Sequence, residues 1–309
     1  MIRYRVTQAQ LRKLINEEKP SWRTRAQDLT AESKREGRFV GHGSKNSGIW
    51  SEIKKVFMRL QHHKCAYCEK PMPEEEEGEP GYDKNEYDIE HYRPKNQVRG
   101  WPNQETISRR EIDYENSIGR GATRGYHLLA HDPLNYVASC KTCNSPYKGD
   151  RFPIAGTADR YEQSPTKLKR LEKPLLPLPF GTWGEDPERL LTFYGPVAVP
   201  AAKSGGRNLR GRVIVDFFNL NGRADLVRQR ANLVALLFPY LEMRRLGTAS
   251  PQVDDFLEAA LSDGGPFASC ARAFADLHDT ELAKAQVLHL ACLGAADKKV
   301  RDLVESLVG

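Results

Sequence analysis

The sequence contains no long apolar run: in its 309 residues, no stretch approaches the roughly 20 apolar residues of a membrane-spanning helix. Charged residues open the chain without an apolar core behind them, which argues against a secretory signal. Six cysteines are too few for a disulfide scaffold at this length, and there is no internal repeat. We therefore expect a cytoplasmic protein with one large core or two modest ones.

Neither sign of charge predominates strongly, because the net charge is only +6. That value excludes the overwhelming basicity of a protein that passively coats nucleic acid. Local charge is more informative: residues 203–230 hold seven Arg and Lys against two Asp, whereas residues 74–77 are four consecutive Glu. Within the basic stretch, Arg207, Arg210 and Arg212 are expected to contact a nucleic-acid backbone. The alternative is that these side chains only solvate a helix surface.

Four of the six cysteines form two pairs, Cys65 with Cys68 and Cys140 with Cys143. The two-residue spacing lets two thiolates bind one tetrahedral zinc, and two such pairs complete its coordination shell. We therefore predict a structural Zn²⁺ that joins two distant segments and contributes to folding. A thioredoxin-like redox role for each pair is the alternative. Cys270 and Cys292 lie in apolar stretches and are expected to pack in the core.

Residues whose side chains suit catalysis lie between the two cysteine pairs and directly after the second pair. His91 has an ordinary pKa near 6.5, so it is largely neutral at pH 7 and suited to accept a proton. Glu90 directly precedes it, and Asn144 directly follows the second pair. A carboxylate and an amide carbonyl suit Mg²⁺ or Mn²⁺. Asn135 and Lys148 stand on either side of the second pair.

The order of these residues, C-x2-C, E-H-x-x-P, N and C-x2-C-N-x3-K-G, resembles the HNH endonuclease family with its ββα-metal core. The similarity covers about residues 55–155. Asn144 stands where many members have a third signature His, as in the HNN variant. Residues 90–95 and 143–149 are most similar to PtuB-type nucleases of bacterial anti-phage defence.

This resemblance implies a metal-dependent endonuclease that hydrolyses phosphodiester bonds, with DNA as the expected substrate. It implies that His91 activates the attacking water and that Asn135 holds the His-bearing loop through its backbone. Glu90 and Asn144 are the implied ligands of a catalytic Mg²⁺ or Mn²⁺, and Lys148 is implied to hold the phosphate. A PtuA-like ATPase partner is implied as well, and we expect it to dock on residues after about 212.

Several alternatives remain open. Glu90 and His91 fall on opposite faces of a strand, so a bulge or the turn at Pro94 has to bring them to one site if Glu90 binds the metal; otherwise Glu90 orients the site. Asp88 is the competing carboxylate, and Asn144 can instead cap the following helix. The whole protein can also be a non-catalytic zinc-containing scaffold that binds nucleic acid, or a toxin that cuts RNA.

The expected fold class is α+β, a ββα-metal HNH core with its four-cysteine zinc site embedded in a largely helical protein. A strand is predicted from Tyr87 until Pro94 ends it, with irregular structure over 20–47 and a polar insertion over 96–126. Apolar periodicity predicts helices over residues 7–19, 51–63, 223–246, 251–262, 266–277, 279–293 and 296–308. The expected segments are an N-terminal helical region and linker (1–54), the nuclease core (55–156), a Pro-rich wrapping segment (157–211) and a helical C-terminal region (212–309).

Overall fold

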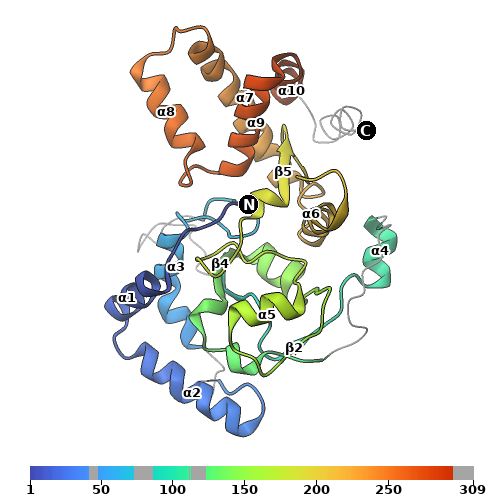
Figure 1. Cartoon of the computed structure of the whole chain (residues 1–309). Coiled ribbons are helices and arrows are strands. Elements are labelled where there is room, and N and C mark those ends of the chain that lie inside the picture. Colours follow the sequence, from blue (N-terminus) through green and yellow to red (C-terminus); the bar gives the residue numbers. More distant parts are fainter. Residues whose placement is uncertain (42–47, 73–85, 111, 113–122, 295–309) are drawn as a thin grey trace. The chain divides into compact units, whose positions relative to one another are not determined.

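The computed structural model describes residues 1–41, 48–72, 86–110, 112 and 123–294, and its chain divides into two compact units (Figure 1). The strand unit comprises residues 3–67 and 72–186, and the helical unit comprises residues 1–2, 68–71 and 187–309. The break at residue 187 falls inside the predicted Pro-rich segment. The acidic run Glu74–Glu77 and the helix predicted over 296–308 lie outside the described residues.

The strand unit begins with α1 (Gln8–Glu18), where the sequence predicts a helix over 7–19. Thr7 caps this helix, because its side-chain oxygen accepts a hydrogen bond from the Gln10 backbone N–H at 3.1 Å. Leu11 and Ile15, one turn apart, are its buried residues. The prediction for this helix is confirmed.

The next helix, α2 (Trp22–Glu36), contradicts the irregular structure predicted over 20–47. Gly37 ends the helix in the left-handed conformation at φ 63°, which a glycine adopts without steric cost. One narrow stripe of the helix is buried, consisting of Trp22, Ala26, Leu29 and Ser33. Two members of this stripe, Ala26 and Ser33, are small, and the rest of the helix is mostly polar or charged, so the sequence gives little apolar signal here.

The helix predicted over 51–63 is shorter in the structure and starts as a 3-10 turn, with η1 (Ile49–Ile53) leading into α3 (Lys54–Leu60). Phe57 is fully buried, as expected, whereas Trp50 is only partly buried. His62 and His63 both have φ of 51°. Two successive left-handed residues cannot continue an α-helix, so the chain turns here toward the first cysteine pair.

The predicted strand is β1 (Tyr87–His91), which pairs antiparallel with β4 (Tyr136–Cys140). Their register runs unbroken from Tyr87 opposite Cys140 to His91 opposite Tyr136. The strand therefore has no bulge at Glu90, and the side chains of Glu90 and His91 point to opposite faces. The sequence does not predict β4, because this strand is buried at every position and lacks alternation.

Short elements lie in the described part of the segment 96–126, which the sequence predicts to be a polar insertion. They are the antiparallel pair β2 (Gln97–Val98) and β3 (Thr123–Arg124), and the helix α4 (Gln104–Arg110). The turns η2 (His127–Leu129) and η3 (Pro133–Asn135) precede β4, and the helical turn η4 (Cys143–Lys148) follows it.

The strand unit ends with α5 (Pro165–Glu172) and a Pro-rich extended stretch. Two side chains attach this stretch to the rest of the strand unit. The Tyr92 hydroxyl donates to the Leu176 carbonyl at 2.7 Å, and Trp183 Nε1 donates to the Leu134 carbonyl at 2.9 Å.

The helical unit starts with the turn η5 (Pro187–Arg189) and the hairpin of β5 (Leu191–Tyr194) with β6 (Val197–Pro200). The described helices that follow are α6 (Gly205–Phe217), α7 (Ala224–Arg245), α8 (Pro251–Leu261), α9 (Ala268–Thr280) and α10 (Leu282–Gly294). The predictions for α7 to α10 are confirmed to within a few residues.

The architecture is thus α+β, with helices and small antiparallel sheets, as the sequence predicts. Among the described residues, every helix is too short or too polar to cross a lipid bilayer.

Candidate metal centre

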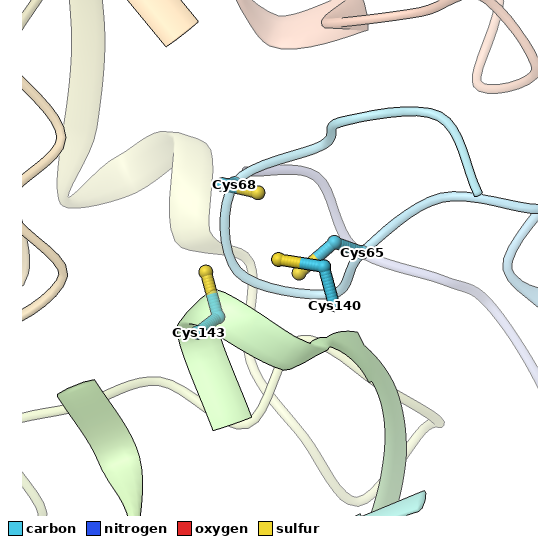
Figure 2. A group of neighbouring side chains, drawn as sticks. All are labelled: Cys65, Cys68, Cys140 and Cys143. Atoms are coloured by element: carbon cyan, nitrogen blue, oxygen red, sulfur yellow. The ribbon is translucent and has the colours of Figure 1, made fainter. Parts of the chain in front are cut away.

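The two cysteine pairs come together in space, and their sulfur atoms face one another (Figure 2). The four Sγ atoms all lie within 4.8 Å of one another, and all four side chains are buried. Sulfurs around a tetrahedral zinc with Zn–S bonds of about 2.3 Å stand about 3.8 Å apart. The group of Cys65, Cys68, Cys140 and Cys143 therefore needs at most a small contraction to bind zinc, and all four thiols are free of disulfides.

The donor set indicates which kind of metal fits the cluster. Four thiolates suit Zn²⁺, whereas Mg²⁺ and Ca²⁺ prefer oxygen. Because four sulfurs complete a tetrahedral shell, no coordination position is left for water or substrate. The cluster therefore fits a structural zinc, and any hydrolytic chemistry has to use other groups.

Backbone hydrogen bonds hold the first cysteine pair beside β4. Ala66, which lies between the two cysteines of that pair, donates its N–H to the Ala138 carbonyl at 3.0 Å. The Gln61 side chain hydrogen-bonds both backbone groups of Ala138. Its Oε1 accepts from the Ala138 N–H at 2.8 Å, and its Nε2 donates to the Ala138 carbonyl at 2.9 Å. Gln61 is fully buried. Nothing in the sequence distinguishes it from an exposed Gln at a helix end.

His91 lies at the end of β1 and is 5% exposed. Its Nε2 lies 2.9 Å from the Ala130 carbonyl, which can only accept, so Nε2 is the donor. The rings of Trp50 and Tyr136 meet it edge-on at centroid distances of 4.6 and 4.9 Å. Burial, and after it the charge of Lys95, holds the pKa of His91 well below its ordinary value. The imidazole is therefore neutral at pH 7 and has a lone pair on Nδ1.

Glu90 and Lys148 form a buried ion pair beside His91. Lys148 Nζ lies 3.1 Å from Glu90 Oε1, and their side chains are 0% and 7% exposed respectively. Lys148 also donates to the His91 carbonyl at 3.4 Å. Burial raises the pKa of Glu90 and lowers the pKa of Lys148, while their mutual attraction opposes both changes. The charge of Lys148 is thus matched by Glu90 before any substrate binds.

The competing carboxylate, Asp88, lies near the surface. Its side chain is 43% exposed and pairs with the exposed Lys141 at 3.2 Å. Glu90 Oε1, in contrast, is buried, and its contact among the described residues is with Lys148 at 3.1 Å. Glu90 is therefore the stronger candidate ligand for a hard cation.

Asn135 is buried and fixes the loop that follows His91. Its Oδ1 accepts from the Arg93 N–H at 2.8 Å, and its Nδ2 donates to the Arg93 carbonyl at 3.0 Å. Its own carbonyl accepts from the Tyr92 N–H at 2.8 Å. These are the kind of backbone hydrogen bonds that the resemblance implies, and a part in catalysis stays a prediction.

Asn144 is the second residue of η4, and Thr142 occupies the cap position. The alternative that Asn144 caps this turn is therefore wrong. Its side chain is half-buried and makes no hydrogen bond to any residue in the described part of the chain. The amide is thus available to a ligand, and metal binding by Asn144 stays a prediction.

Lys95 belongs to the sequence motif, but the pattern assigns it no role. Its Nζ lies 4.5 Å from the ring centroid of Trp50 and 5.7 Å from that of Phe39. Burial lowers its pKa, against the attraction of Glu90. No carboxylate of the described residues lies within 4.0 Å of it. Unlike Lys148, it is a cation without an ion-pair partner there.

A second buried ion pair lies behind the same loop. Arg93 Nε donates to Glu172 Oε2 at 2.8 Å, and the two side chains are 5% and 0% exposed. The Tyr126 hydroxyl donates to the other oxygen of Glu172. The Arg93 guanidinium lies 5.3 Å from the ring centroid of Phe152. This pair links the end of α5 to the loop that Asn135 holds, and no local sequence pattern indicates it.

The basic stretch over 203–230 is not uniform. Arg207 is exposed on α6, and Arg210 and Arg212 are partly buried there. Arg223 and Arg230 are buried, and Arg230 donates to two backbone carbonyls at 2.8 and 2.6 Å. These two guanidinium groups belong to the interior of the helical unit. Nucleic-acid binding by the three residues of α6 stays a prediction.

Comparison with known proteins identifies no relative. The chain matches no family model, no curated protein and no solved structure at a significant level.

Proposed function

We propose that this protein is an HNH-type, metal-dependent endonuclease that hydrolyses phosphodiester bonds with His91 as the general base. The observation that carries the proposal is the buried, neutral imidazole whose Nε2–H is committed to the Ala130 carbonyl. Its Nδ1 lone pair is left as a proton acceptor. The antiparallel pair β1–β4, followed by η4 and flanked by the cysteine cluster, is compatible with a ββα-metal core.

The proposed reaction is an attack of water on phosphorus. The water gives a proton to His91 Nδ1 as its oxygen forms a bond to phosphorus. The bond from phosphorus to the leaving sugar oxygen breaks, and that oxygen takes a proton from solvent. Lys95 is placed to stabilise the charge on the non-bridging oxygens, because its ammonium has no carboxylate partner within the described residues. Lys148 holds Glu90 in place instead.

Asn144 and Glu90 are the proposed ligands of the catalytic Mg²⁺ or Mn²⁺. Because Glu90 points to the face of β1 opposite His91, it shares a site with His91 only through the turn at Pro94, and it otherwise orients the site. A buried carboxylate and an amide whose side chain has no hydrogen bond in the described residues offer the oxygen ligands of a hard cation. Such a cation, when bound, supplies charge stabilisation at the phosphate and the leaving oxygen. Lys148 competes for the same carboxylate, so we expect weak metal binding in the absence of nucleic acid.

The test uses the full chain with plasmid DNA, single-stranded DNA and tRNA, each with and without Mg²⁺ or Mn²⁺. His91→Ala should lower the cleavage rate about 10²- to 10⁴-fold, since it removes the proton acceptor, and should leave nucleic-acid binding intact. His62→Asn, at an exposed position with φ of 51°, is the control and should cut normally. Cleavage by His91→Ala at the unmodified rate would sink the mechanism.

The same assay separates the alternatives. A non-catalytic zinc scaffold binds nucleic acid but cuts none of the substrates with either metal. An RNA-cutting toxin cuts tRNA and leaves both DNA substrates whole. Asn144→Ala should also lose most activity, and recovery at higher Mn²⁺ would indicate that Asn144 binds the metal.

We also propose, on the resemblance alone, a role in anti-phage defence with a PtuA-like ATPase partner. The helical unit exposes three leucines that suit a protein contact, Leu246, Leu290 and Leu293, each 61% exposed. Co-purification of such a partner should fail with Leu246→Asp/Leu290→Asp. Undiminished co-purification by that variant would place the contact elsewhere.

A further inference from the structure

The strand unit contains a cavity of about 510 Å³ between the chain after α2 and the β2–β3 pair. This volume lies within the roughly 300–1,000 Å³ of typical ligand pockets. The residues that line it include Arg38, Phe39, Asn96, Gln97, Arg124 and His127. We call this cavity the basic pocket.

The described residues that line the basic pocket include two cations and no carboxylate, and the nearby Asp150 accepts a hydrogen bond from Gln97 at 2.6 Å. Arg124 donates to the Tyr161 hydroxyl at 3.1 Å, and this neutral partner leaves its charge unbalanced. Arg38 is 71% exposed and lies 3.9 Å from Glu36, a long and solvent-screened ion pair. Two guanidinium groups on one cavity favour an anion, and their planar forks suit phosphate oxygens.

His127 supplies a buried polar group. It lines the basic pocket and is 2% exposed. Burial lowers the pKa of the His127 ring, which the nearby Gly125 backbone opposes, while Nδ1 makes no well-aligned hydrogen bond within the described residues. A buried polar atom of this kind usually finds a partner in a ligand or in water. A ring nitrogen can either donate to or accept from the edge of a nucleobase, depending on its tautomer.

Phe39 connects the basic pocket to His91 through a series of contacts. Lys95 Nζ lies 5.7 Å from the Phe39 ring and 4.5 Å from the Trp50 ring. Trp50 in turn meets the His91 ring at 4.6 Å. A ligand in the basic pocket is thus only a few side chains from the candidate base, and Lys95 lies between the two.

We propose that the basic pocket binds an unstacked base and phosphate of a single-stranded nucleic acid, and that Lys95 holds the adjoining phosphate toward His91. This inference rests on the proposed function and names its substrate class. A base reaches Phe39 only after leaving its own stack, so single strands, loops and frayed ends bind and an intact duplex does not. Stacking and phosphate contacts are shared by DNA and RNA, so the pocket chemistry does not select the sugar.

The test measures binding by fluorescence anisotropy, using zinc-loaded full chain without added Mg²⁺ or Mn²⁺. The probes are a short single-stranded DNA, the RNA of the same sequence, and the DNA duplex. Arg38→Ala/Arg124→Ala should weaken single-strand binding at least tenfold and lower the salt slope by about 1.4, which is two phosphates at about 0.7 each. Phe39→Leu, which keeps an apolar side chain, should weaken binding roughly 5- to 150-fold.

Lys34→Ala/Arg35→Ala is the matched control. Both side chains are exposed at the end of α2, Arg35 at 72% against 71% for Arg38, and their removal costs the same two charges as the double Arg variant. It should bind as the unmodified chain does. If the double Arg variant and Phe39→Leu also bind normally, or if the duplex binds more tightly than either single strand, the inference is wrong. Loss of binding in Arg207→Ala/Arg210→Ala/Arg212→Ala alone would likewise overturn it and favour α6.

Cleavage is measured separately, so that the two proposals fail differently. If the pocket variants lose single-strand binding while the unmodified chain cuts nothing, the basic pocket stands and the nuclease proposal fails. If the unmodified chain cuts while the pocket variants bind normally, only the basic pocket fails. Should Phe39→Leu reduce the melting temperature, the double Arg variant decides, because Arg124 is exposed and Arg38 largely so.

Discussion

The two compact units of this protein are stabilised in different ways. The strand unit has short elements and buries ion pairs between them, namely Glu90 with Lys148 and Arg93 with Glu172. The helical unit has longer helices that bury many apolar side chains. It also buries one ion pair, between the Met1 amino group and Glu69, beside partly exposed pairs such as Arg272 with Glu188, which are 29% and 34% exposed.

A charged side chain is usually buried only where it has a partner. Replacing a buried ion pair with apolar side chains often leaves the protein no less stable. The buried ion pairs of the strand unit therefore say little about its stability, and they are better explained by a role in positioning the groups of the candidate site. They hold a carboxylate and the loop after His91 in fixed positions. In the helical unit, burial of apolar side chains along the longer helices contributes more, beside the buried pair of the Met1 amino group with Glu69. Variants in the two units should accordingly differ in their effects.

The largest effect is expected at the cysteine cluster. Purified protein should hold about one zinc per chain, and Cys65→Ser or Cys140→Ser should lose it together with most soluble protein. A structural zinc contributes roughly 10–16 kcal/mol of apparent binding free energy, comparable to the roughly 5–15 kcal/mol stability of a domain. Cys292→Ala, at a buried cysteine outside the cluster, should retain zinc. Elemental analysis that finds no zinc in folded, active protein would contradict this.

The next largest effect is expected from breaking a buried ion pair. Arg93→Met leaves the Glu172 carboxylate buried without its cation and should lower the free energy of unfolding by about 3–5 kcal/mol. Arg272→Met in the helical unit should cost about 1 kcal/mol or less, because its pair is partly in water. Chemical denaturation of both variants measures the difference. Equal losses would mean that burial does not distinguish the two units.

Two side-chain amides, one in each unit, allow a second comparison of the effect of burial. Gln61 binds both backbone groups of Ala138, and Asn221 binds both backbone groups of Ala198 at 2.8 Å each. Gln61 is fully buried and Asn221 is half-buried. Gln61→Ala should therefore lower the free energy of unfolding by about 2–4 kcal/mol, and Asn221→Ala by about 1–2 kcal/mol, since water can replace part of the lost bonding. A larger loss from Asn221→Ala would be incompatible with this reasoning.

The units also differ in how well the sequence predicts them. Helices α7 to α10 are rich in Leu and Ala, which favour helix formation through local sequence alone, and their predictions are confirmed. The cysteine grouping is equally predictable, because spacing alone indicates it. In contrast, α2 escapes prediction because its buried stripe is narrow, and β4 because it is buried at every position.

The contacts that complete the site could not be predicted at all. Gln61 binds Ala138 across 77 positions, and Arg93 reaches Glu172 across 79. Lys95 lies beside aromatic rings and His127 lines a cavity only because of tertiary packing, which the local sequence does not indicate. Adjacency in sequence placed Glu90 beside His91, but only the structure shows that Lys148 already neutralises that carboxylate.

The smallest effect is expected at an ion pair of the helical unit that depends on pH. Glu242 accepts from Arg245 at 2.8 and 2.9 Å and contacts His278 Nε2 at 2.7 Å. The Arg245 hydrogen bonds, and after them His278, lower the pKa of Glu242 from 4.5 to about 2. Because the folded-state pKa lies below the ordinary value, the ionised carboxylate contributes stability above pH 4.5 and loses it as pH falls toward 2.

Glu242→Gln should therefore lower the melting temperature by a few degrees at most at pH 7, since the groups are partly solvated and screening weakens the pair. The difference from the unmodified chain should shrink as pH falls from 4.5 and should vanish near pH 2. Glu258→Gln on α8, which removes an exposed carboxylate without an ion pair in the described residues, should show no such trend. A deficit in Glu242→Gln that stays constant down to about pH 2 would mean that packing of the side chain, rather than its charge, makes the contribution.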